Sequence, residues 1–147
     1  MATKENKLIP CVCLILKKDN QILLIKRKNT GWHDGYYSLV GGSSDGNETM
    51  TQAVIREAKE ELGIEIAEEF LKVVHAVFTT GHENQRIVSF IFEATNWKGE
   101  LKNMEPEKHE NFEWFEMNNF PENIIPCDKV IIQKAYNKIF YSEFGWE

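Results

Sequence analysis

The chain has 147 residues, of which 42% are hydrophobic and 27% are charged, a composition typical of a globular protein. This length suits a single domain with a sizeable core, so we expect residues 1–147 to form one domain. The formal net charge of −6 argues against binding to a nucleic acid polymer, because an acidic surface repels phosphates. An acidic protein that handles phosphates needs local cations, so a bound metal ion is a reasonable expectation.

Neither a membrane segment nor a disulfide framework is expected. No apolar run is long enough for a transmembrane helix or a signal peptide. The three cysteines, Cys11, Cys13 and Cys127, are few and odd in number, which favours a reducing cytoplasm. Cys11 and Cys13 share one face of a predicted strand, and we interpret them as small core residues.

Apolar runs rich in Val, Ile and Leu predict strands in the first third of the chain, at residues 8–16, 21–28 and 36–40. The polar segments between them predict a turn at 17–20 and a loop at 29–35. After the third strand we expect Gly41-Gly42 to form a glycine-rich loop that leads toward a helix.

That helix is predicted from Thr49 to Leu62. Thr49 and Gln52 have the spacing of a capping box, and Gly63 suits a left-handed C-terminal cap. The later segments predict strands at 70–79, 86–95 and 111–116, a polar loop at 80–85 and an amphipathic helix at 128–141. Together these elements predict an α/β fold with helices packed on a mixed sheet.

Three carboxylates gather on one face of the first predicted helix. Glu57, Glu60 and Glu61 are three and four residues apart, so they are neighbours on the helix surface. Unpaired, they would repel one another, whereas a hard divalent cation such as Mg²⁺ prefers oxygen ligands of this kind. The glycines let the backbone approach a ligand closely, and a helix N-terminus favours anions. The pattern therefore indicates a site that holds metal and phosphate together.

The full spacing, Gly42-x5-Glu48-x7-Arg56-Glu57-Ala58-x-Glu60-Glu61-x-Gly63-Ile64, resembles the Nudix box, the signature of the MutT-like hydrolases. Ala58 replaces a bulkier aliphatic residue of that signature, and Val40 stands where many members have proline before the paired glycines. The likeness extends to residues 35–39, 97–100, 105–108 and 114–115. It covers most of the chain, although only the box is highly specific.

The resemblance implies a mixed β-sheet sandwiched between α-helices, with the box forming a loop–helix–loop catalytic motif. It also implies ligands for Mg²⁺, with Mn²⁺ as a substitute: the carboxylates of Glu57, Glu60 and Glu61 and the carbonyl of Gly41. Arg56 would hold the glutamates in place. Glu48 would pair with Arg56 or reach the metal through water.

The implied chemistry is attack of water on phosphorus, which needs a base to take the proton of the water. The candidates are Glu57 and Glu61 in the box and Glu105 or Glu107 in a later loop, with Glu105 preferred of that pair. Substrate contacts are open: arginines suit phosphates and aromatic rings suit bases. The candidates are Arg27, Arg86 and Phe78, together with Trp32, Tyr36 and Trp114, and each has an equally simple structural interpretation. The four histidines are interpreted as structural or surface residues, and His75 is the one most expected to line the site.

We therefore expect hydrolysis of a phosphoanhydride bond in a nucleoside diphosphate linked to another moiety. A (d)NTP pyrophosphohydrolase ranks just above an ADP-ribose or nucleotide-sugar pyrophosphatase. A non-catalytic nucleotide-sensing module is the alternative from another class, although the intact box argues against it. An isoprenoid diphosphate isomerase and RNA cap removal fit less well. The expected partner is a small-molecule nucleotide, and a homodimer is left open.

Overall fold

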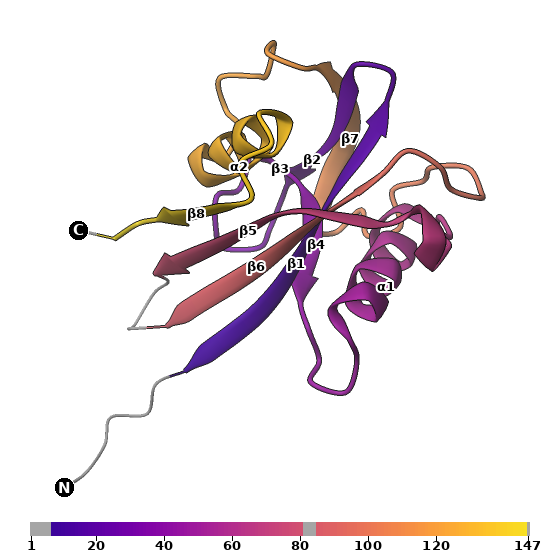
Figure 1. Cartoon of the computed structure of the whole chain (residues 1–147). Helices are drawn as coiled ribbons and strands as arrows, with labels where there is room; N and C mark the ends of the chain where they lie inside the picture. Colours follow the sequence, from indigo (N-terminus) through magenta and orange to yellow (C-terminus); the bar gives the residue numbers. More distant parts are fainter. Residues whose placement is uncertain (1–6, 81–84, 147) are drawn as a thin grey trace, which may run out of the picture.

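A computed structural model describes residues 7–80 and 85–146 (Figure 1). Its strands are β1 (Leu8–Lys18), β2 (Gln21–Arg27), β3 (Tyr37–Ser38), β4 (Val40–Ser43), β5 (Lys72–Thr80), β6 (Arg86–Ala94), β7 (His109–Glu116) and β8 (Tyr141–Phe144). Its helices are α1 (Met50–Leu62), α2 (Pro126–Tyr136) and the short 3₁₀ helix η1 (Glu68–Phe70).

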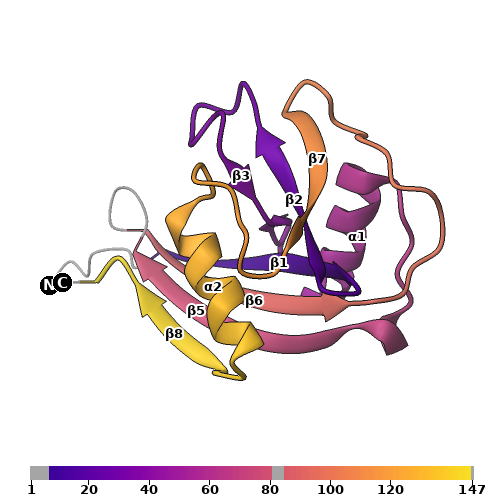
Figure 2. The ribbon, with the colours of Figure 1, turned by 90° about the horizontal axis from the view of Figure 1, so that it is seen from above.

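The strands form one mixed sheet in the order β3-β2-β1-β6-β5-β8, with β4 paired to β1 and β7 paired to β2. β1 runs parallel to β6 and antiparallel to β2 and β4. β8 pairs in parallel with β5 at the edge of the sheet (Figure 2). The predicted mixed sheet is therefore confirmed.

β1 lies between two hydrophobic cores because its side chains alternate between the two faces of the sheet. Val12, Leu14 and Leu16 pack in a core to which α1 contributes Ala53, Val54, Ala58 and Leu62. Ile15 packs in the other core, to which α2 contributes Ile131 and Ile132. The sheet is thus held between the two helices, which confirms the predicted layers (Figure 1).

Local hydrogen bonds fix both ends of α1. The N–H of Gln52 donates to Thr49 Oγ1 at 3.1 Å, and the N–H of Thr49 donates to Gln52 Oε1 at 2.9 Å, which confirms the predicted capping box. Gly63 ends the helix at φ 70°, with its N–H donating to the Lys59 carbonyl at 3.0 Å. With both ends fixed, the rotation of the helix and the direction of its glutamates are also fixed.

Two sequence predictions are wrong in detail. Gly41 and Gly42 belong to β4 rather than to a loop, because they pair with Cys13 and Val12 of β1. The C-terminal helix spans Pro126–Tyr136 and not 128–141. Lys138 turns the chain with φ 59°, and residues 141–144 then form β8 instead of a last helical turn.

Other boundaries move by a few residues. Residues 68–70 form η1, so the strand predicted from residue 70 begins at Lys72. The middle of the predicted loop 80–85, including His82, lies outside the described residues. Cys11, Cys13 and Cys127 are free and partly buried, and Cys13 packs against a core as expected, whereas Cys11 belongs to neither core. Among the described residues, no helix has the length and apolar character needed to cross a membrane.

Candidate active site

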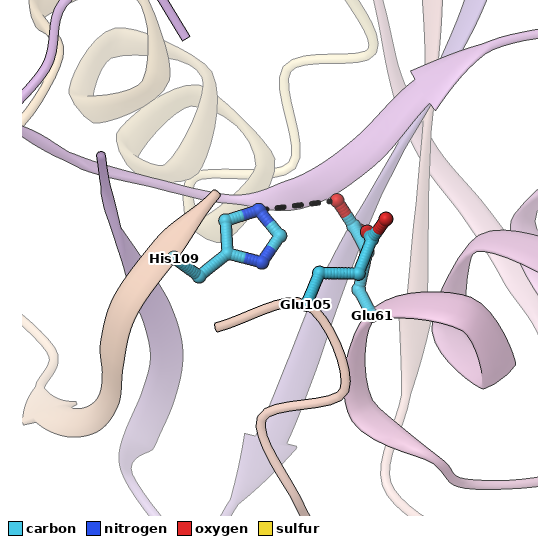
Figure 3. A group of neighbouring side chains, drawn as sticks. All are labelled: Glu61, Glu105 and His109. Atoms are coloured by element: carbon cyan, nitrogen blue, oxygen red, sulfur yellow. Dashed lines mark ion pairs between the residues drawn. The ribbon is translucent and has the colours of Figure 1, made fainter. Parts of the chain in front are cut away.

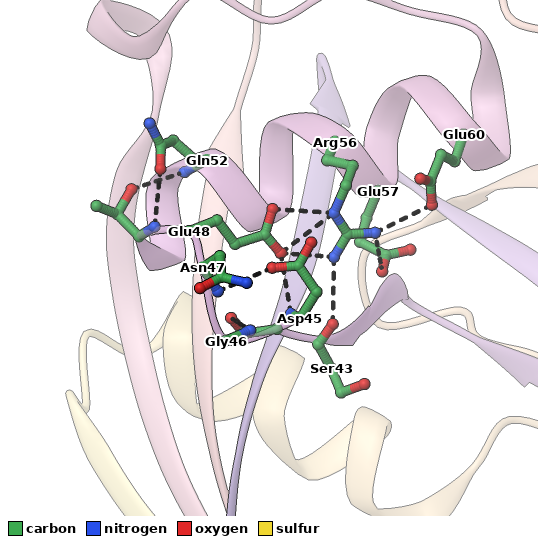
Figure 4. A network of polar contacts seen from close by, with 11 residues as sticks. Ser43, Asp45, Gly46, Asn47, Glu48, Gln52, Arg56, Glu57 and Glu60 are labelled. Carbon is green, nitrogen blue, oxygen red and sulfur yellow. Dashed lines mark hydrogen bonds and ion pairs between the residues drawn. The ribbon is translucent and has the colours of Figure 1, made fainter.

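Arg56 is the centre of the polar network on the exposed side of α1 (Figure 4). Its Nε donates to both carboxylate oxygens of Glu48 at 3.1 and 3.0 Å, and its Nη2 donates to Glu48 Oε1 at 2.7 Å. Its Nη1 donates to Glu57 Oε1 and to Glu60 Oε2, each at 3.0 Å. A bond from Nη2 to the Ser43 carbonyl at 3.2 Å ties the network to β4. One guanidinium therefore orients three glutamates.

The pKa values in this network follow from that arrangement. Hydrogen bonds from Arg56 lower the pKa of Glu48, and the carboxylates around Arg56 raise the pKa of the guanidinium. Burial raises the pKa of Glu57 even though Arg56 acts in the opposite direction. Glu57 is thus a desolvated carboxyl whose charged form depends on a nearby cation.

The two box glycines of β4 lie directly against the glutamates of α1. The N–H of Gly41 donates to Glu61 Oε2 at 3.0 Å. A β-carbon on Gly42 would lie 2.5 Å from Glu57 Oε1, closer than a carbon and an oxygen can approach. A side chain at position 42 would therefore displace the carboxylate, which explains why the box needs glycine there.

Glu61, Glu105 and His109 form a second group beside this network (Figure 3). One ligand atom from each lies within 4.8 Å of the others, and His109 Nε2 is 3.6 Å from Glu61 Oε1. Glu61 and His109 are only 7% and 4% exposed. Burial, and then the charge of Glu57, raise the pKa of Glu61 to about 9. Burial also lowers the pKa of His109.

A tight turn places Glu105 and His109 side by side. The Asn103 side-chain amide donates to the His109 carbonyl at 2.6 Å, while its oxygen accepts the N–H of Glu105 at 3.3 Å. The N–H of His109 also donates to the Glu105 carbonyl at 2.9 Å. Asn103 therefore positions both side chains toward Glu61.

These residues fit a divalent cation. Arg56 is engaged with Glu48, Glu57 and Glu60, so it does not neutralise Glu61. His109 Nδ1 is buried and has no hydrogen-bond partner among the described residues. Oxygen donors with one imidazole match the ligands that Mg²⁺ and Mn²⁺ accept. A bound ion would supply the positive charge that balances the buried carboxylate of Glu61.

The structure gathers most of the predicted site residues around this group. Most of the box positions lie where β4 and α1 meet: Gly41, Gly42, Glu48, Arg56, Glu57, Glu60 and Glu61. Gly63 instead ends α1 and lies next to Met104. Glu105 joins them from the loop before β7, whereas Glu107 is exposed and outside the group. Glu60 is also largely exposed, and it pairs with Arg56.

Arg27 is held by the loop that follows β2. Its Nε donates to the Trp32 carbonyl at 2.8 Å, its Nη2 donates to Thr30 Oγ1 at 3.0 Å, and its guanidinium lies 4.9 Å from the Trp32 ring. Its positive charge acts to lower the pKa of Glu61 and of Asp128. Arg27 also pairs with His109 in the register of β2 and β7, which places it beside a residue of the group.

Other candidates lie elsewhere. Phe78 packs against Trp146 at the β8 edge, with ring centroids 5.1 Å apart. Arg86 begins β6, where it pairs with Thr80, and within the described part of the chain its side chain forms no ion pair with the glutamates. His75 does not line the site, contrary to expectation, because its nitrogens bond to Ile139 and Ser142.

One residue of the site, His109, was missed by sequence reasoning, as was a carboxylate outside it, Asp128. His109 was interpreted as structural, although its spacing of four from Glu105 is a signal that could have linked them. Asp128 lies near the start of α2, and its carboxylate accepts the N–H of Leu39 at 2.9 Å. Burial raises the pKa of Asp128 to about 6. No local pattern pairs Asp128 with Leu39, which lies between β3 and β4, since the two residues are brought together only by the fold.

A mixed sheet between two helices, with glycines of one strand backed by helix glutamates, defines a MutT-like fold. The sequence model of the NUDIX domain matches residues 7–135 of the chain. The protein therefore belongs to the Nudix hydrolase family, whose members include pyrophosphohydrolases.

Similar proteins support this assignment. An ADP-ribose pyrophosphatase of Methanocaldococcus jannaschii is 37% identical over 80% of this chain and 67% of its own length. An 8-oxo-dGTP diphosphatase of Proteus vulgaris is 30% identical over 66% of this chain and 84% of its own. The crystal structure of a MutT NUDIX hydrolase from Burkholderia pseudomallei superposes with a TM-score of 0.79 at 27% identity, covering 91% and 99% of the two chains.

Proposed function

We propose that this enzyme hydrolyses a phosphoanhydride bond of a small nucleotide, a nucleoside diphosphate linked to another moiety, with Mg²⁺ as its metal and Mn²⁺ as a substitute. The observation that carries the proposal is the meeting of Glu57, Glu61 and Glu105 at one end of β4. Carboxylates so placed repel one another unless a divalent cation joins them.

Each residue has a distinct task in this proposal. Glu57, Glu60, Glu61 and the Gly41 carbonyl hold the ion, which neutralises phosphate charge when bound. Arg56 is a positioning residue, because its guanidinium keeps the box glutamates in one arrangement. Arg27 is available to a phosphate beside the carboxylates.

Glu105 is the preferred base for the attacking water. It lies on a loop rather than in the box, and it faces Glu61 across the group (Figure 3). It is half-buried, with Lys108 Nζ at 3.5 Å from its Oε2. Glu105 thus combines partial access to water with a position next to the metal-binding carboxylates, which a proton acceptor needs.

Two substrates are supported. A (d)NTP substrate remains first, because the 8-oxo-dGTP diphosphatase relative and the MutT structure align over most of their own lengths. ADP-ribose is the second, because the pyrophosphatase relative is more identical and covers more of this chain. The bond cleaved is of the same type in both cases.

The test is a panel of nucleotides with Mg²⁺, with Mn²⁺ and with chelator, followed by identification of the products. Release of pyrophosphate from a triphosphate supports the first substrate, and AMP with ribose phosphate supports the second. Persistent turnover in chelator contradicts the metal dependence. Nucleotide binding without turnover of any substrate would instead favour a sensing module.

Glu105→Gln and Glu107→Gln form a matched pair for the base. The two residues are two positions apart on the same loop, but only Glu105 belongs to the group with Glu61. We expect Glu105→Gln to lower kcat by roughly 100-fold or more and Glu107→Gln to leave it nearly unchanged. Equal losses in the two variants would remove Glu105 from this role.

A further inference from the structure

His109 is a buried histidine with one ring nitrogen, Nδ1, that has no hydrogen-bond partner among the described residues, 7–80 and 85–146. The residue is 4% exposed. Its Nε2 approaches Glu61 Oε1 to 3.6 Å, which is longer than a good hydrogen bond. Buried polar atoms nearly always have a hydrogen-bond partner, so the unpaired ring nitrogen needs a physical explanation.

His75 provides an internal comparison, because it is even more deeply buried. One of its ring nitrogens lies 2.7 Å from the Ile139 carbonyl, and the other lies 2.7 Å from Ser142 Oγ. His75 joins β5 to the segment around β8 and has a structural role that uses both nitrogens. His109 is held by its backbone, yet its ring edge faces Glu61 and Glu105 (Figure 3).

We infer that His109 is a nitrogen ligand of the divalent ion held by Glu61 and the other box glutamates, with Glu105 beside it. This inference rests on the proposed metal-dependent function. Octahedral ligands about 2.1 Å from an ion lie roughly 3 Å apart when adjacent and about 4.2 Å apart when opposite. His109 Nε2 and Glu61 Oε1 are 3.6 Å apart, between these two separations, so one ion can contact both atoms.

A nitrogen ligand has a consequence for metal choice. Mg²⁺ strongly prefers oxygen, whereas Mn²⁺ and the later transition metals accept imidazole more readily. A site with His109 is therefore expected to favour Mn²⁺ over Mg²⁺ more than a site of carboxylates alone. Asn103 contributes indirectly, because it keeps His109 and Glu105 on the same turn.

The decisive measurement is pulsed electron paramagnetic resonance of the whole protein loaded with Mn²⁺. We expect modulation from a directly bound ¹⁴N nucleus, replaced by the ¹⁵N pattern when the histidines are labelled with ¹⁵N. His109→Phe should abolish it, and His33→Phe, in an exposed loop histidine, should retain it. His109→Gln, which keeps a polar side chain, is a second variant in case His109→Phe does not fold. The test for bound nitrogen in the wild-type spectrum depends on no variant.

Titration calorimetry gives a second readout. His109→Phe should lower the affinity for Mn²⁺ about 10-fold while changing the affinity for Mg²⁺ much less, since only one of these ions benefits from imidazole. A wild-type Mn²⁺ spectrum without bound nitrogen, or a nitrogen signal that persists in His109→Phe, overturns the assignment.

The failure of this inference and that of the proposed function are distinguishable. Magnesium-dependent turnover with a Mn²⁺ spectrum that shows only oxygen ligands overturns the role of His109 alone. A bound histidine nitrogen without hydrolysis of any nucleotide overturns the proposed function and leaves the assignment of His109 in place. Absence of any divalent ion binding overturns both.

Discussion

Gly42 and Glu57 are in such close contact that a β-carbon at position 42 would lie 2.5 Å from Glu57 Oε1. Gly42→Ala should therefore push the carboxylate out of place while the sheet stays paired. Because a displacement of about 1 Å at a reacting centre can cost 10²-fold, we expect kcat/KM to fall about 10- to 100-fold. Steady-state kinetics at saturating Mg²⁺, with a thermal melt to confirm folding, checks this.

Gly41→Ala is the matched control for this substitution. A β-carbon there would meet the backbone of β1 at Val12 and Cys13, which cannot move aside as a side chain can. We expect a loss of stability of about 1–3 kcal/mol, the usual cost of overpacking. If Gly42→Ala lost as much stability as Gly41→Ala while its activity stayed unchanged, the contact between Gly42 and Glu57 would have no role in catalysis.

Arg56→Lys should show that the shape of the guanidinium matters in addition to its charge. Lysine cannot bond to Glu48 through two nitrogens and reach Glu57 and Glu60 at the same time. We expect kcat/KM to fall roughly 100-fold, as for other misplaced catalytic groups. Kinetics of the variant beside Lys59→Gln, an exposed change on the same helix, provides the test.

Lys59 pairs with Glu65 at 3.8 Å on the surface, where such pairs contribute little. The Lys59→Gln control should therefore keep nearly full activity. A wild-type rate in Arg56→Lys would mean that positive charge alone orients the glutamates, and an equal loss in both variants would point to a general effect on α1.

The sequence was informative wherever the interactions are local. The start and end of α1 depend on Thr49, Gln52 and Gly63, all within reach of the helix itself. The spacing of Arg56 and the box glutamates likewise fixes their common face, since the helix repeat is regular. These features were predicted correctly because sequence distance and spatial distance nearly coincide.

Prediction failed where distant strands decide the structure. Ile139 and Phe140 continue the helical spacing of apolar residues, yet the chain turns at Lys138 and pairs β8 with β5. For the same reason the two histidines were misassigned: His75, expected to line the site, bonds to Ser142, and His109, expected to be structural, lies beside Glu61. The partners of the two histidines, Ser142 and Glu61, are distant in the sequence and become neighbours only through the sheet.

Glu60→Gln and Glu61→Gln should separate metal binding from stability. Both should reduce metal-dependent turnover, by roughly 100- to 1,000-fold, because each removes a ligand charge. Only Glu61→Gln should raise the Tm without metal at neutral pH, because burial raises the pKa of Glu61 and so penalises its charged form. Glu60 is largely exposed, so Glu60→Gln removes no buried carboxylate.

Kinetics and metal-free melts of these two variants check both expectations. Glutamine at position 61 can still accept the Gly41 N–H, so the backbone contact is preserved. A wild-type rate in Glu60→Gln would exclude Glu60 as a ligand. A lower Tm in Glu61→Gln would show that the ionised carboxylate stabilises the fold without a metal.

Asp128→Asn should remove a pH-dependent cost of folding. The pKa of this half-buried carboxyl is raised to about 6, chiefly by burial, above the ordinary value of 3.8. The folded state therefore binds the proton more tightly than the unfolded state, so stability falls as pH rises from about 4 to 6 and stays reduced above that range.

Asparagine does not titrate and can still accept the Leu39 N–H. We expect the variant to be more stable than the wild type by about 3 kcal/mol at pH 7.5, with little difference near pH 4. Denaturant unfolding across this pH range measures the gap, and a gap that widens toward acid would show that the charged form of Asp128 is the one that the fold favours.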